Sequence, residues 1–300
     1  MSRRSVFSSM HEVHDPERSA LIGTLRRHGI TPHKRLGQVF LFRSSVAEQM
    51  VSFARINSSD VVVEIGAGLG ILTAPLANSG ARIIGLEYDS RLATYLKREL
   101  RRGNVEVERA DALNFGYGRL SERSGKKLII MGNLPYYLTS PLIFRLLGLR
   151  PYISRMVLMM QREVADRISA RPGTHGYGII SILSQMFFQV AHRLTVLKDC
   201  FYPLPAVDSE VVAFTLRSQP LTALADEKAF ATLVKLSFAH PRKTLLNAFK
   251  GCDYLCRGKE RMVEALNAAG IDPMRRAQTV SIAEYARLSN TLAAAQCPDV

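Results

Sequence analysis

From Val61 onward, short apolar runs alternate with stretches of helical character. Apolar runs of about five residues are typical of buried strands, and the stretches between them have the length of helices. This alternation predicts the α/β class, with a mostly parallel sheet covered by helices on both faces. Strands are predicted over 61–65, 82–86, 105–108, 128–131 and 156–160, and helices over 71–79, 91–100, 141–147, 162–170 and 178–188.

Both ends of the chain read as helical. Asp15-Pro16 predicts the start of a helix that His28-Gly29 ends. Ser45 and Glu48 predict a capping box for a helix ending near Ile56.

Strand-like runs at 193–197 and 210–216 predict a hairpin that closes one side of the sheet, and helices are predicted over 227–238, 242–249, 259–268 and 282–293. We therefore expect an N-terminal helical extension over 1–30, an α/β domain over 31–218 and a small all-α domain over 219–300.

The charge balance indicates a polyanionic partner. Lys and Arg number 40 against 26 Asp and Glu, a formal net charge of +14. Nucleic acid is the first candidate for such a partner, and an anionic membrane surface is the alternative. No apolar run is long enough to span a bilayer, and the first residues lack the apolar core of a secretory signal. We therefore expect a cytoplasmic protein with no membrane partner.

Cysteine spacing predicts no metal site. The four cysteines are Cys200, Cys252, Cys256 and Cys297, and none belongs to a Cys-x-x-Cys pair. No histidine cluster completes a ligand set. We expect reduced structural thiols and no bound metal.

The stretch Asn133-Leu134-Pro135-Tyr136 directly follows the predicted strand at 128–131. In open α/β sheets, ligands bind beyond the carboxyl ends of the strands. Asn133 is able to accept a hydrogen bond from an aromatic amine, Pro135 fixes the turn, and Tyr136 offers a face for stacking. Together they predict a clamp for the exocyclic amine of a flipped-out adenine. An ordinary Asn-x-Pro turn leaving a strand is the alternative interpretation.

A glycine loop joins the first predicted strand to its helix. Glu64 precedes the sequence Gly66-Ala67-Gly68-Leu69-Gly70. The dinucleotide fingerprint requires G-x-G-x-x-G, but position 71 is Ile. The observed G-x-G-x-G spacing, with an acid before it, favours S-adenosylmethionine over NAD, because that cofactor has no pyrophosphate to cradle. A purely structural tight turn remains the alternative for Gly66 and Gly68.

Two carboxylates follow the next two predicted strands. Glu87 ends the second strand, where an acid is placed to accept hydrogen bonds from ribose hydroxyls. Asp111, with Ala112 beside it, ends the third strand and is placed to accept from the cofactor's adenine amine. A solvated acid at a strand end, a role that Asp89 would fit equally, and an Asp that caps a turn are the alternatives. The glycine loop, Glu87, Asp111 and Asn133 nevertheless end four successive strands at one edge.

This set resembles the ribosomal small-subunit RNA adenine dimethyltransferase family over nearly the whole chain. The N-terminal and central segments that carry the resemblance are Lys34-Arg35-Leu36-Gly37-Gln38-Val39-Phe40-Leu41, Val62-Val63-Glu64-Ile65-Gly66-Ala67-Gly68-Leu69-Gly70 and Gly132-Asn133-Leu134-Pro135-Tyr136. The later segments are Gln161-Arg162-Glu163-Val164-Ala165-Asp166-Arg167, Tyr177-Gly178, Phe201-Tyr202-Pro203-Leu204-Pro205-Ala206-Val207-Asp208-Ser209, and Phe238 with Arg242-Lys243-Thr244-Leu245-Leu246-Asn247. The last block separates this family from the large-subunit adenine methyltransferases.

The resemblance implies a Rossmann-like class I methyltransferase sheet with a helical C-terminal domain. It also implies S-adenosylmethionine-dependent dimethylation of the N6 amines of two adjacent adenines near the 3′ end of small-subunit ribosomal RNA. The expected partner is this RNA in the assembling small ribosomal subunit, and we expect a monomer. The resemblance adds cofactor contacts at Gln38, Val39 and Leu41, and RNA contacts at Lys34, Arg35, Arg242 and Lys243.

The expected mechanism uses Asn133 and the Leu134 carbonyl to accept hydrogen bonds from the adenine amine. Tyr136 and Phe201 are expected to sandwich the flipped base, and a core position is the alternative for Phe201. Two residues depart from the family pattern. Val39 and Tyr137 occupy positions where the family commonly has Asn, and the change at Val39 removes a side-chain hydrogen bond to the cofactor.

Three further functions compete with this one: the same chemistry on another RNA, a ribosome-assembly or transcription factor that keeps the fold without catalysis, and an NAD-dependent oxidoreductase. The retention of Gly66, Glu87, Asp111 and Asn133 argues against the binding-only protein, and the glycine spacing argues against the oxidoreductase.

Overall fold

The computed structural model describes residues 15–250 and 258–296. Its main feature is a seven-stranded sheet of order β4-β3-β2-β5-β6-β9-β7. The strands are β2 (Val61–Ile65), β3 (Arg82–Glu87), β4 (Val105–Arg109), β5 (Leu128–Asn133), β6 (Ile153–Gln161), β7 (Phe188–Val196) and β9 (Ser209–Leu216). The five strands from β4 to β6 are parallel, and β9 runs antiparallel between β6 and β7. The predicted parallel sheet and its closing antiparallel pair are confirmed.

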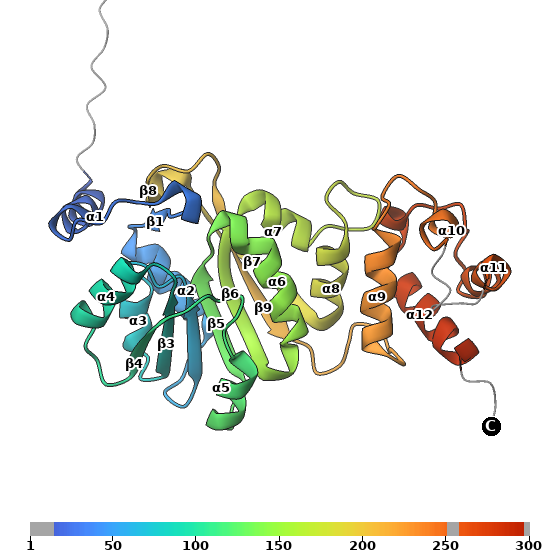
Figure 1. The fold of residues 1–300 in the computed structure, drawn as a ribbon, viewed down its shortest axis with the longest axis horizontal. Helices are drawn as coiled ribbons and strands as arrows, with labels where there is room; N and C mark the ends of the chain where they lie inside the picture. Colours follow the sequence, from blue (N-terminus) through green and yellow to red (C-terminus); the bar gives the residue numbers. More distant parts are fainter. Residues whose placement is uncertain (1–14, 251–257, 297–300) are drawn as a thin grey trace, which may run out of the picture.

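Helices cover both faces of the sheet (Figure 1). Those before the C-terminal region are α1 (Pro16–Arg27), α2 (Ser44–Ala54), α3 (Thr73–Ala77), α4 (Ser90–Glu99), α5 (Tyr117–Ser124), α6 (Thr139–Gly148), α7 (Arg162–Ile168) and α8 (Ile179–Phe187). Alternate residues of β2 face opposite sides, as the pleat of a strand requires. Val63 packs in the core shared with α6 and α8, whereas Val62 packs in the core shared with α2 and α3.

A two-stranded sheet lies beside the carboxyl edge of the main sheet. Its strands are β1 (Phe40–Leu41) and β8 (Phe201–Tyr202), which pair antiparallel. This pairing joins the N-terminal segment to the connection between β7 and β9. It places residues 38–41 over the ends of the parallel strands.

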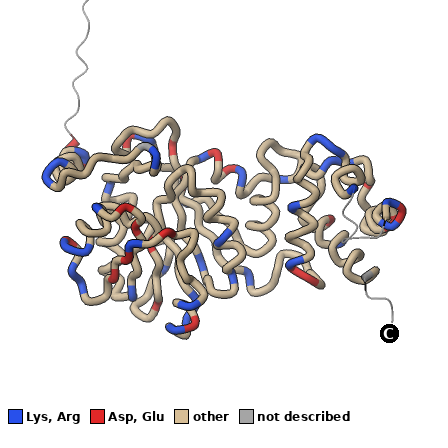
Figure 2. The backbone as a smooth tube through the Cα atoms, in the orientation of Figure 1, with Lys and Arg blue, Asp and Glu red and all other residues tan. Residues whose placement is uncertain are grey.

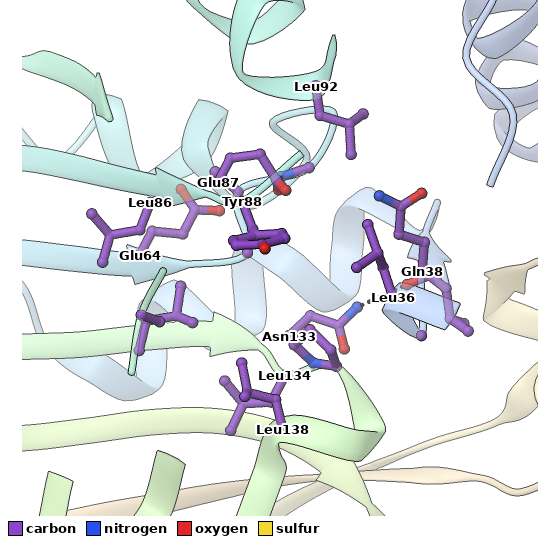
Figure 3. Close-up of a pocket in the computed structure, with 18 of the residues that line it drawn as sticks. Leu36, Gln38, Glu64, Leu86, Glu87, Tyr88, Leu92, Asn133, Leu134 and Leu138 are labelled. Carbon is purple, nitrogen blue, oxygen red and sulfur yellow. Dashed lines mark hydrogen bonds between the residues drawn. The ribbon is translucent and has the colours of Figure 1, made fainter. Parts of the chain in front are cut away.

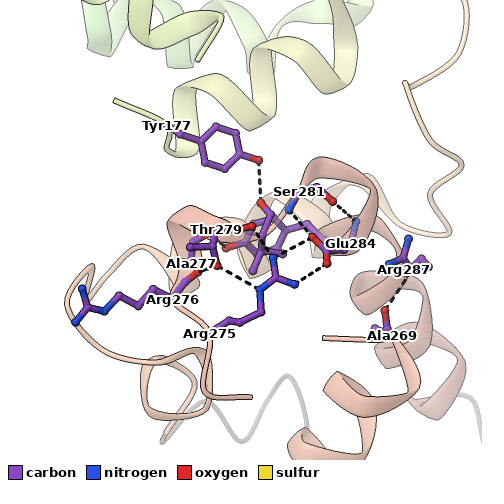
Figure 4. Close-up of polar contacts among 11 residues, drawn as sticks. Tyr177, Ala269, Arg275, Arg276, Ala277, Thr279, Ser281, Glu284 and Arg287 are labelled. Atoms are coloured by element: carbon purple, nitrogen blue, oxygen red, sulfur yellow. Dashed lines mark hydrogen bonds and ion pairs between the residues drawn. The ribbon is translucent and has the colours of Figure 1, made fainter. Parts of the chain in front are cut away.

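The C-terminal part of the described chain is helical. Its helices are α9 (Glu227–Ser237), α10 (Leu245–Ala248), α11 (Lys259–Ala268) and α12 (Ile282–Gln296). The hydrophobic core runs continuously from the sheet through α8 into these helices, and Phe187 meets Phe230 edge-on at 6.4 Å between ring centroids. The Tyr177 hydroxyl donates to the Val280 carbonyl at 3.0 Å, and Figure 4 shows this contact beside the ion pair of Arg275 and Glu284.

Several local predictions were wrong. The predicted capping box does not form, because α2 begins at Ser44 and its N-cap Arg43 makes no side-chain capping bond. The Glu17 carboxylate instead accepts from the Ser44 backbone N–H at 3.0 Å. Helix α10 is shorter than the predicted 242–249, and α5 was not predicted. The sequence of α5 is mostly polar, and only Tyr117 and Ser121 are buried.

Other features lie outside the described residues or are absent from them. The cysteines at 252, 256 and 297 are among the residues that are not described, and Cys200 is a free, half-buried thiol. Within 15–250 and 258–296, no helix has the length and apolar character that a membrane crossing requires.

The close contact between β2 and β5 makes a stability prediction. A Cβ atom added at Gly132 would lie 2.5 Å from the Ile65 carbonyl oxygen, which is backbone and is held in the sheet. Gly132→Ala should therefore lower the free energy of unfolding by about 2 kcal/mol or more. Urea unfolding measures this change. Gly148→Ala is the matched control, because nothing lies within 4 Å of the added carbon, and it should cost nothing. Equal stability of the two variants would contradict the prediction.

Candidate active site

A cavity of about 370 Å³ lies where the parallel strands end. Its walls come from the carboxyl ends of β2, β3, β4 and β5 and from the N-terminal segment around β1. Figure 3 shows side chains from the ends of β2, β3 and β5 and from this N-terminal segment. Every residue predicted to contact the cofactor lines this cavity: Gln38, Val39, Leu41, Glu64, Gly66, Gly68, Glu87, Asp111, Ala112 and Asn133. The structure therefore gathers the whole predicted set in one place.

The glycine loop is tied to strand β3. Gly66 and Gly68 have φ values of 72° and 56°, a region that side chains other than glycine rarely adopt. The Gly66 N–H donates to the Leu86 carbonyl at 2.9 Å, and the Gly68 N–H donates to the Glu87 carboxylate at 2.9 Å. The loop thus holds one carboxylate oxygen of Glu87 in position at the edge of the cavity.

Glu87 and Asp89 have different roles. Asp89 caps α4, accepting from the Arg91 backbone N–H at 2.9 Å, and the Arg91 guanidinium keeps the pKa of Asp89 well below its usual range. Glu87 is 7 % exposed and lines the cavity, and burial raises its pKa while N–H groups of Asp89 and Gly68 oppose that rise. The carboxylate free to meet a ligand at this strand end is therefore Glu87.

Glu64 is a buried acid without a complete set of partners. Its side chain is 1 % exposed, lines the cavity and leaves Oε2 with no hydrogen-bond partner. Burial raises the pKa of Glu64 to about 8, the Thr73 hydroxyl opposes this rise, and the negative charge of Glu87 adds to it. Buried polar atoms are normally satisfied, so this orphan marks a place where a ligand's donor group fits. Two neighbouring acids also suit a ligand that carries positive charge and hydroxyl groups, as S-adenosylmethionine does.

Asn133 is held by the N-terminal segment. Its side-chain Nδ2 donates to the Val39 carbonyl oxygen at 3.2 Å, across the gap between β5 and β1. Because an amide has one NH₂ side and one oxygen side, this bond directs Oδ1 away from Val39 as an acceptor. Val39 thus contributes its backbone to the site although its side chain has no polar atom.

The Gln38 side chain connects the N-terminal segment to the start of α4. Its side-chain oxygen accepts from the His33 N–H at 2.8 Å, and its Nε2 donates to Asp89 at 3.0 Å. Both ends of the amide are therefore used to fasten the N-terminal segment to the start of α4. Leu41 is 3 % exposed and pairs with Phe201 in the small sheet.

Asp111 combines a structural contact with a place in the cavity. One carboxylate oxygen accepts from the Leu113 N–H at 2.9 Å and the other from the Asn114 side chain at 2.8 Å. The turn-capping alternative is thus present. The side chain is half-buried and lines the cavity next to Ala112. Each carboxylate oxygen has a second acceptor site, so the capping bonds leave room for a ligand's amine.

The turn after β5 is rigid. The Pro135 carbonyl accepts from the Leu138 N–H at 2.9 Å and from the Thr139 hydroxyl at 3.1 Å. The Tyr136 hydroxyl lies 3.4 Å from Ser209 Oγ, which fixes the ring from the side of β9. Leu134 is buried and its N–H donates to the Met159 carbonyl at 2.9 Å. The four motif residues therefore share a turn that is fixed from several directions and lines the cavity.

The structure does not support the predicted stacking role of Phe201. Its side chain is 2 % exposed, does not line the cavity and packs in the core with residues of α2 and β6. The Phe-x-Pro-x-Pro pattern suggested a stiff surface loop, but the pairing of Phe201 with Leu41 draws the ring inward. The core alternative is the one that this structure supports.

The residues predicted to contact RNA lie in two regions. Arg35 is exposed at the rim of the cavity, and the side chain of Lys34 is outside the described part of the chain. Arg242 and Lys243 are exposed just before α10. Figure 2 shows basic residues over both the sheet region and the C-terminal helices. The structure does not bring the two predicted groups together.

No role was predicted from the sequence for two tyrosines at the cavity, of which Tyr137 departs from the family pattern. Tyr88 follows Glu87 directly and is 60 % exposed, and Tyr137 is 56 % exposed. Both line the cavity, and Figure 3 shows Tyr88 among its side chains. The position of Tyr88 immediately after an acid at a strand end was the available signal.

Comparison with known proteins supports a single family. The model of the family described as "Ribosomal RNA adenine dimethylase" matches residues 29–294. The chain is 41 % identical over 276 residues to "Ribosomal RNA small subunit methyltransferase A" of Pelotomaculum thermopropionicum, covering 89 % of this chain and 93 % of the relative.

Two crystal structures share the fold. A dimethyladenosine transferase from Plasmodium falciparum has a TM-score of 0.69 at 26 % identity, covering 83 % of this chain and 95 % of that one. The 23S rRNA methyltransferase ErmE has a TM-score of 0.64 at 25 % identity, covering 85 % of this chain and 99 % of that one.

The buried acid predicts a pH dependence of stability. Between the ordinary pKa of 4.5 and the folded value of about 8, native Glu64 keeps a proton that the unfolded chain has lost. Stability from this group is therefore present at low pH and is lost as the pH rises through that window, by up to about 1.4 kcal/mol per pH unit. Glu64→Gln should remove this slope, as measured by urea unfolding from pH 5.5 to 8. The exposed Glu122→Gln should keep it, and identical pH profiles of wild type and Glu64→Gln would refute the assignment.

Proposed function

The chain belongs to the ribosomal RNA adenine dimethylase family, and from this we propose that it dimethylates adenines of small-subunit ribosomal RNA. The reaction transfers methyl groups from S-adenosylmethionine to the N6 amines of two adjacent adenines near the 3′ end of that RNA. The observation that carries the proposal is the Asn133 amide, which the Val39 carbonyl orients at 3.2 Å. The 41 % identity to a small-subunit enzyme favours this RNA over the large-subunit RNA of ErmE.

S-adenosylmethionine supplies an electrophilic methyl group on a sulfonium centre. We assign Glu87 to the ribose hydroxyls, Asp111 to the adenine amine, and the glycine loop with Glu64 to the methionyl part. The two carboxylates at the ends of β3 and β4 and the orphaned oxygen of Glu64 match the donors that such a ligand carries. Gln38 and Leu41 shape the wall that faces these residues.

The chain's own contribution to the chemistry is positioning. An adenine amine is a weak nucleophile because its lone pair is delocalised into the ring. Hydrogen bonds from its two N–H groups to Asn133 Oδ1 and the Leu134 carbonyl draw the nitrogen toward tetrahedral geometry. The lone pair is then less delocalised into the ring and faces the methyl group. The rigid turn of Pro135 holds both acceptors, so little reorganisation is needed during reaction. Transfer breaks the bond between sulfur and methyl, which leaves a neutral thioether and an N-methylated ammonium. This ammonium is acidic enough to lose its proton to water, so no strong base is required.

The substrate base must leave its stack to reach this turn. Tyr136 is the proposed stacking surface, because its ring lines the cavity and its hydroxyl is tethered near Ser209. A stacked base contributes on the order of 1–3 kcal/mol. Tyr136 and Phe201 were both predicted to stack on the base. Because Phe201 lies in the core, we assign stacking to Tyr136 alone.

We assign phosphate recognition to basic residues in two separate regions of the molecule. Arg35 at the rim of the cavity and Lys34 beside it are proposed to hold the RNA strand that enters the site. Arg242 and Lys243 are proposed to contact a second RNA region, in keeping with the net charge of +14. Such contacts make RNA binding fall steeply with salt.

The wider setting is also a proposal. We propose that the RNA is presented by an assembling small ribosomal subunit in the cytoplasm, and that the protein acts as a monomer. The proposed organisation keeps an N-terminal extension over 1–30, a catalytic domain over 31–218 and a helical C-terminal domain over 219–300.

Replacing the oriented amide tests the proposed function. Asn133→Ala removes an acceptor needed in the transition state, so methyl transfer should fall at least about 100-fold. Binding to small ribosomal subunits should stay within about twofold, because Asn133 makes no phosphate contact in the proposal. Radiolabel transfer and subunit co-sedimentation measure the two effects.

The control for this experiment is Asn267→Ala on α11, where the side chain is exposed and distant from the cavity in sequence and fold. It should match wild type in both assays. Full turnover by Asn133→Ala would overturn the proposed clamp.

A further inference from the structure

Helix α1 ends in a way that brings two apolar side chains together. Gly29 has φ of 61°, the Ile30 N–H donates to the Leu25 carbonyl at 2.9 Å, and the Gly29 N–H donates to the Arg26 carbonyl at 3.1 Å. These paired bonds form a Schellman motif, in which the residue after the glycine packs on the last turn of the helix. Leu25 and Ile30 are the residues at those two positions.

Leu25 and Ile30 belong to one small core with Phe40 of β1 and Leu92 of α4. Their side chains are 3 %, 5 %, 8 % and 1 % exposed, respectively. Leu69 of the glycine loop packs against the same core. Since Phe40, Leu69 and Leu92 all line the cavity, the first helix lies directly behind the cavity wall.

Polar contacts also fasten α1 to the rest of the protein. Glu17 accepts from Ser44 Oγ at 2.6 Å and pairs with Arg43 at 3.0 Å, and His28 contacts Arg98 at 2.9 Å. The Arg43 and Glu17 side chains are 37 % and 35 % exposed, so water screens this ion pair and its net contribution is small. Arg43 also pairs with the Asp15 carboxylate at the N-cap of α1, which is 16 % exposed, so α1 is attached both by ion pairs and by the apolar core of Leu25 and Ile30.

We propose that α1 is a positioning element that sets the affinity for S-adenosylmethionine. Leu25 and Ile30 hold Phe40 in place, and Phe40 adjoins Val39, whose carbonyl orients Asn133. Helix α1 (Pro16–Arg27) lies outside the range of 29–294 that the family model matches. The inference rests on the proposed function only in taking S-adenosylmethionine as the ligand.

The proposed effect on affinity depends on the fraction of molecules in which residues 38–41 of the cavity wall are ordered for binding. If loosening Leu25 leaves residues 38–41 ordered in one tenth of the molecules, the apparent Kd rises about tenfold, because Kd divides by the competent fraction. Once the ligand is bound and saturating, the wall is re-formed. The expected signature is therefore a raised KM for S-adenosylmethionine with a nearly unchanged kcat.

The test compares two leucine truncations in the full chain by calorimetry with S-adenosylmethionine. Leu25→Ala should raise the Kd about tenfold. Leu266→Ala is the control, because Leu266 is fully buried in α11, far from the cavity wall, and its truncation should lower stability without changing the Kd. Leu25→Met, which keeps the side-chain volume, should restore wild-type affinity.

Amide hydrogen exchange of residues 38–42 without ligand supplies a second readout. Protection there should fall in Leu25→Ala and stay unchanged in Leu266→Ala. If Leu25→Ala does not fold, Gly29→Ala replaces it, because only backbone strain opposes a side chain there, with no atom within 4 Å. Wild-type affinity in the α1 variant would overturn the inference while leaving the proposed function intact. A wild-type chain that does not bind S-adenosylmethionine would overturn both.

Discussion

Parallel strands that end at one edge are the constraint on which the site depends. Glu64, Glu87, Asp111 and Asn133 are far apart in the sequence, and only the order β4-β3-β2-β5 brings them around one cavity. The strands supply rigid positions, while the turns after them supply the chemistry. The N-terminal segment completes the arrangement, because the Val39 carbonyl fixes the direction of the Asn133 amide.

Burial gives the acids of this cavity their character. Glu64 is almost fully buried beside Glu87, and its raised pKa favours the neutral form at neutral pH. Two adjacent carboxylates would repel each other in an apolar cavity, and protonation of one relieves that repulsion. A ligand with positive charge and hydroxyl groups offers the complementary partner. These acids thus lower the stability of the protein without a ligand and favour binding of the proposed cofactor.

The sequence predicted the features that depend on local pattern. The apolar runs located the strands, and the acids and glycines after them coincided with the strand ends, so the cavity wall could be anticipated residue by residue. Features that depend on contacts between distant residues could not be predicted from the sequence. Phe201 pairs with Leu41 and lies in the core. Helix α5 forms from mostly polar sequence in which Tyr117 and Ser121 are buried and Leu120 packs against the core. The support of Phe40 by Leu25 also needed the fold, since nothing local in the sequence shows that the two meet.

The most direct test of the account is methyl transfer from labelled S-adenosylmethionine to small ribosomal subunits that lack the modification, with the labelled nucleoside identified by mass. We expect N6,N6-dimethyladenosine at two adjacent positions near the 3′ end of the small-subunit RNA. Binding of the protein to these subunits without any incorporation of label would contradict it, and would indicate a protein that assists assembly without catalysis.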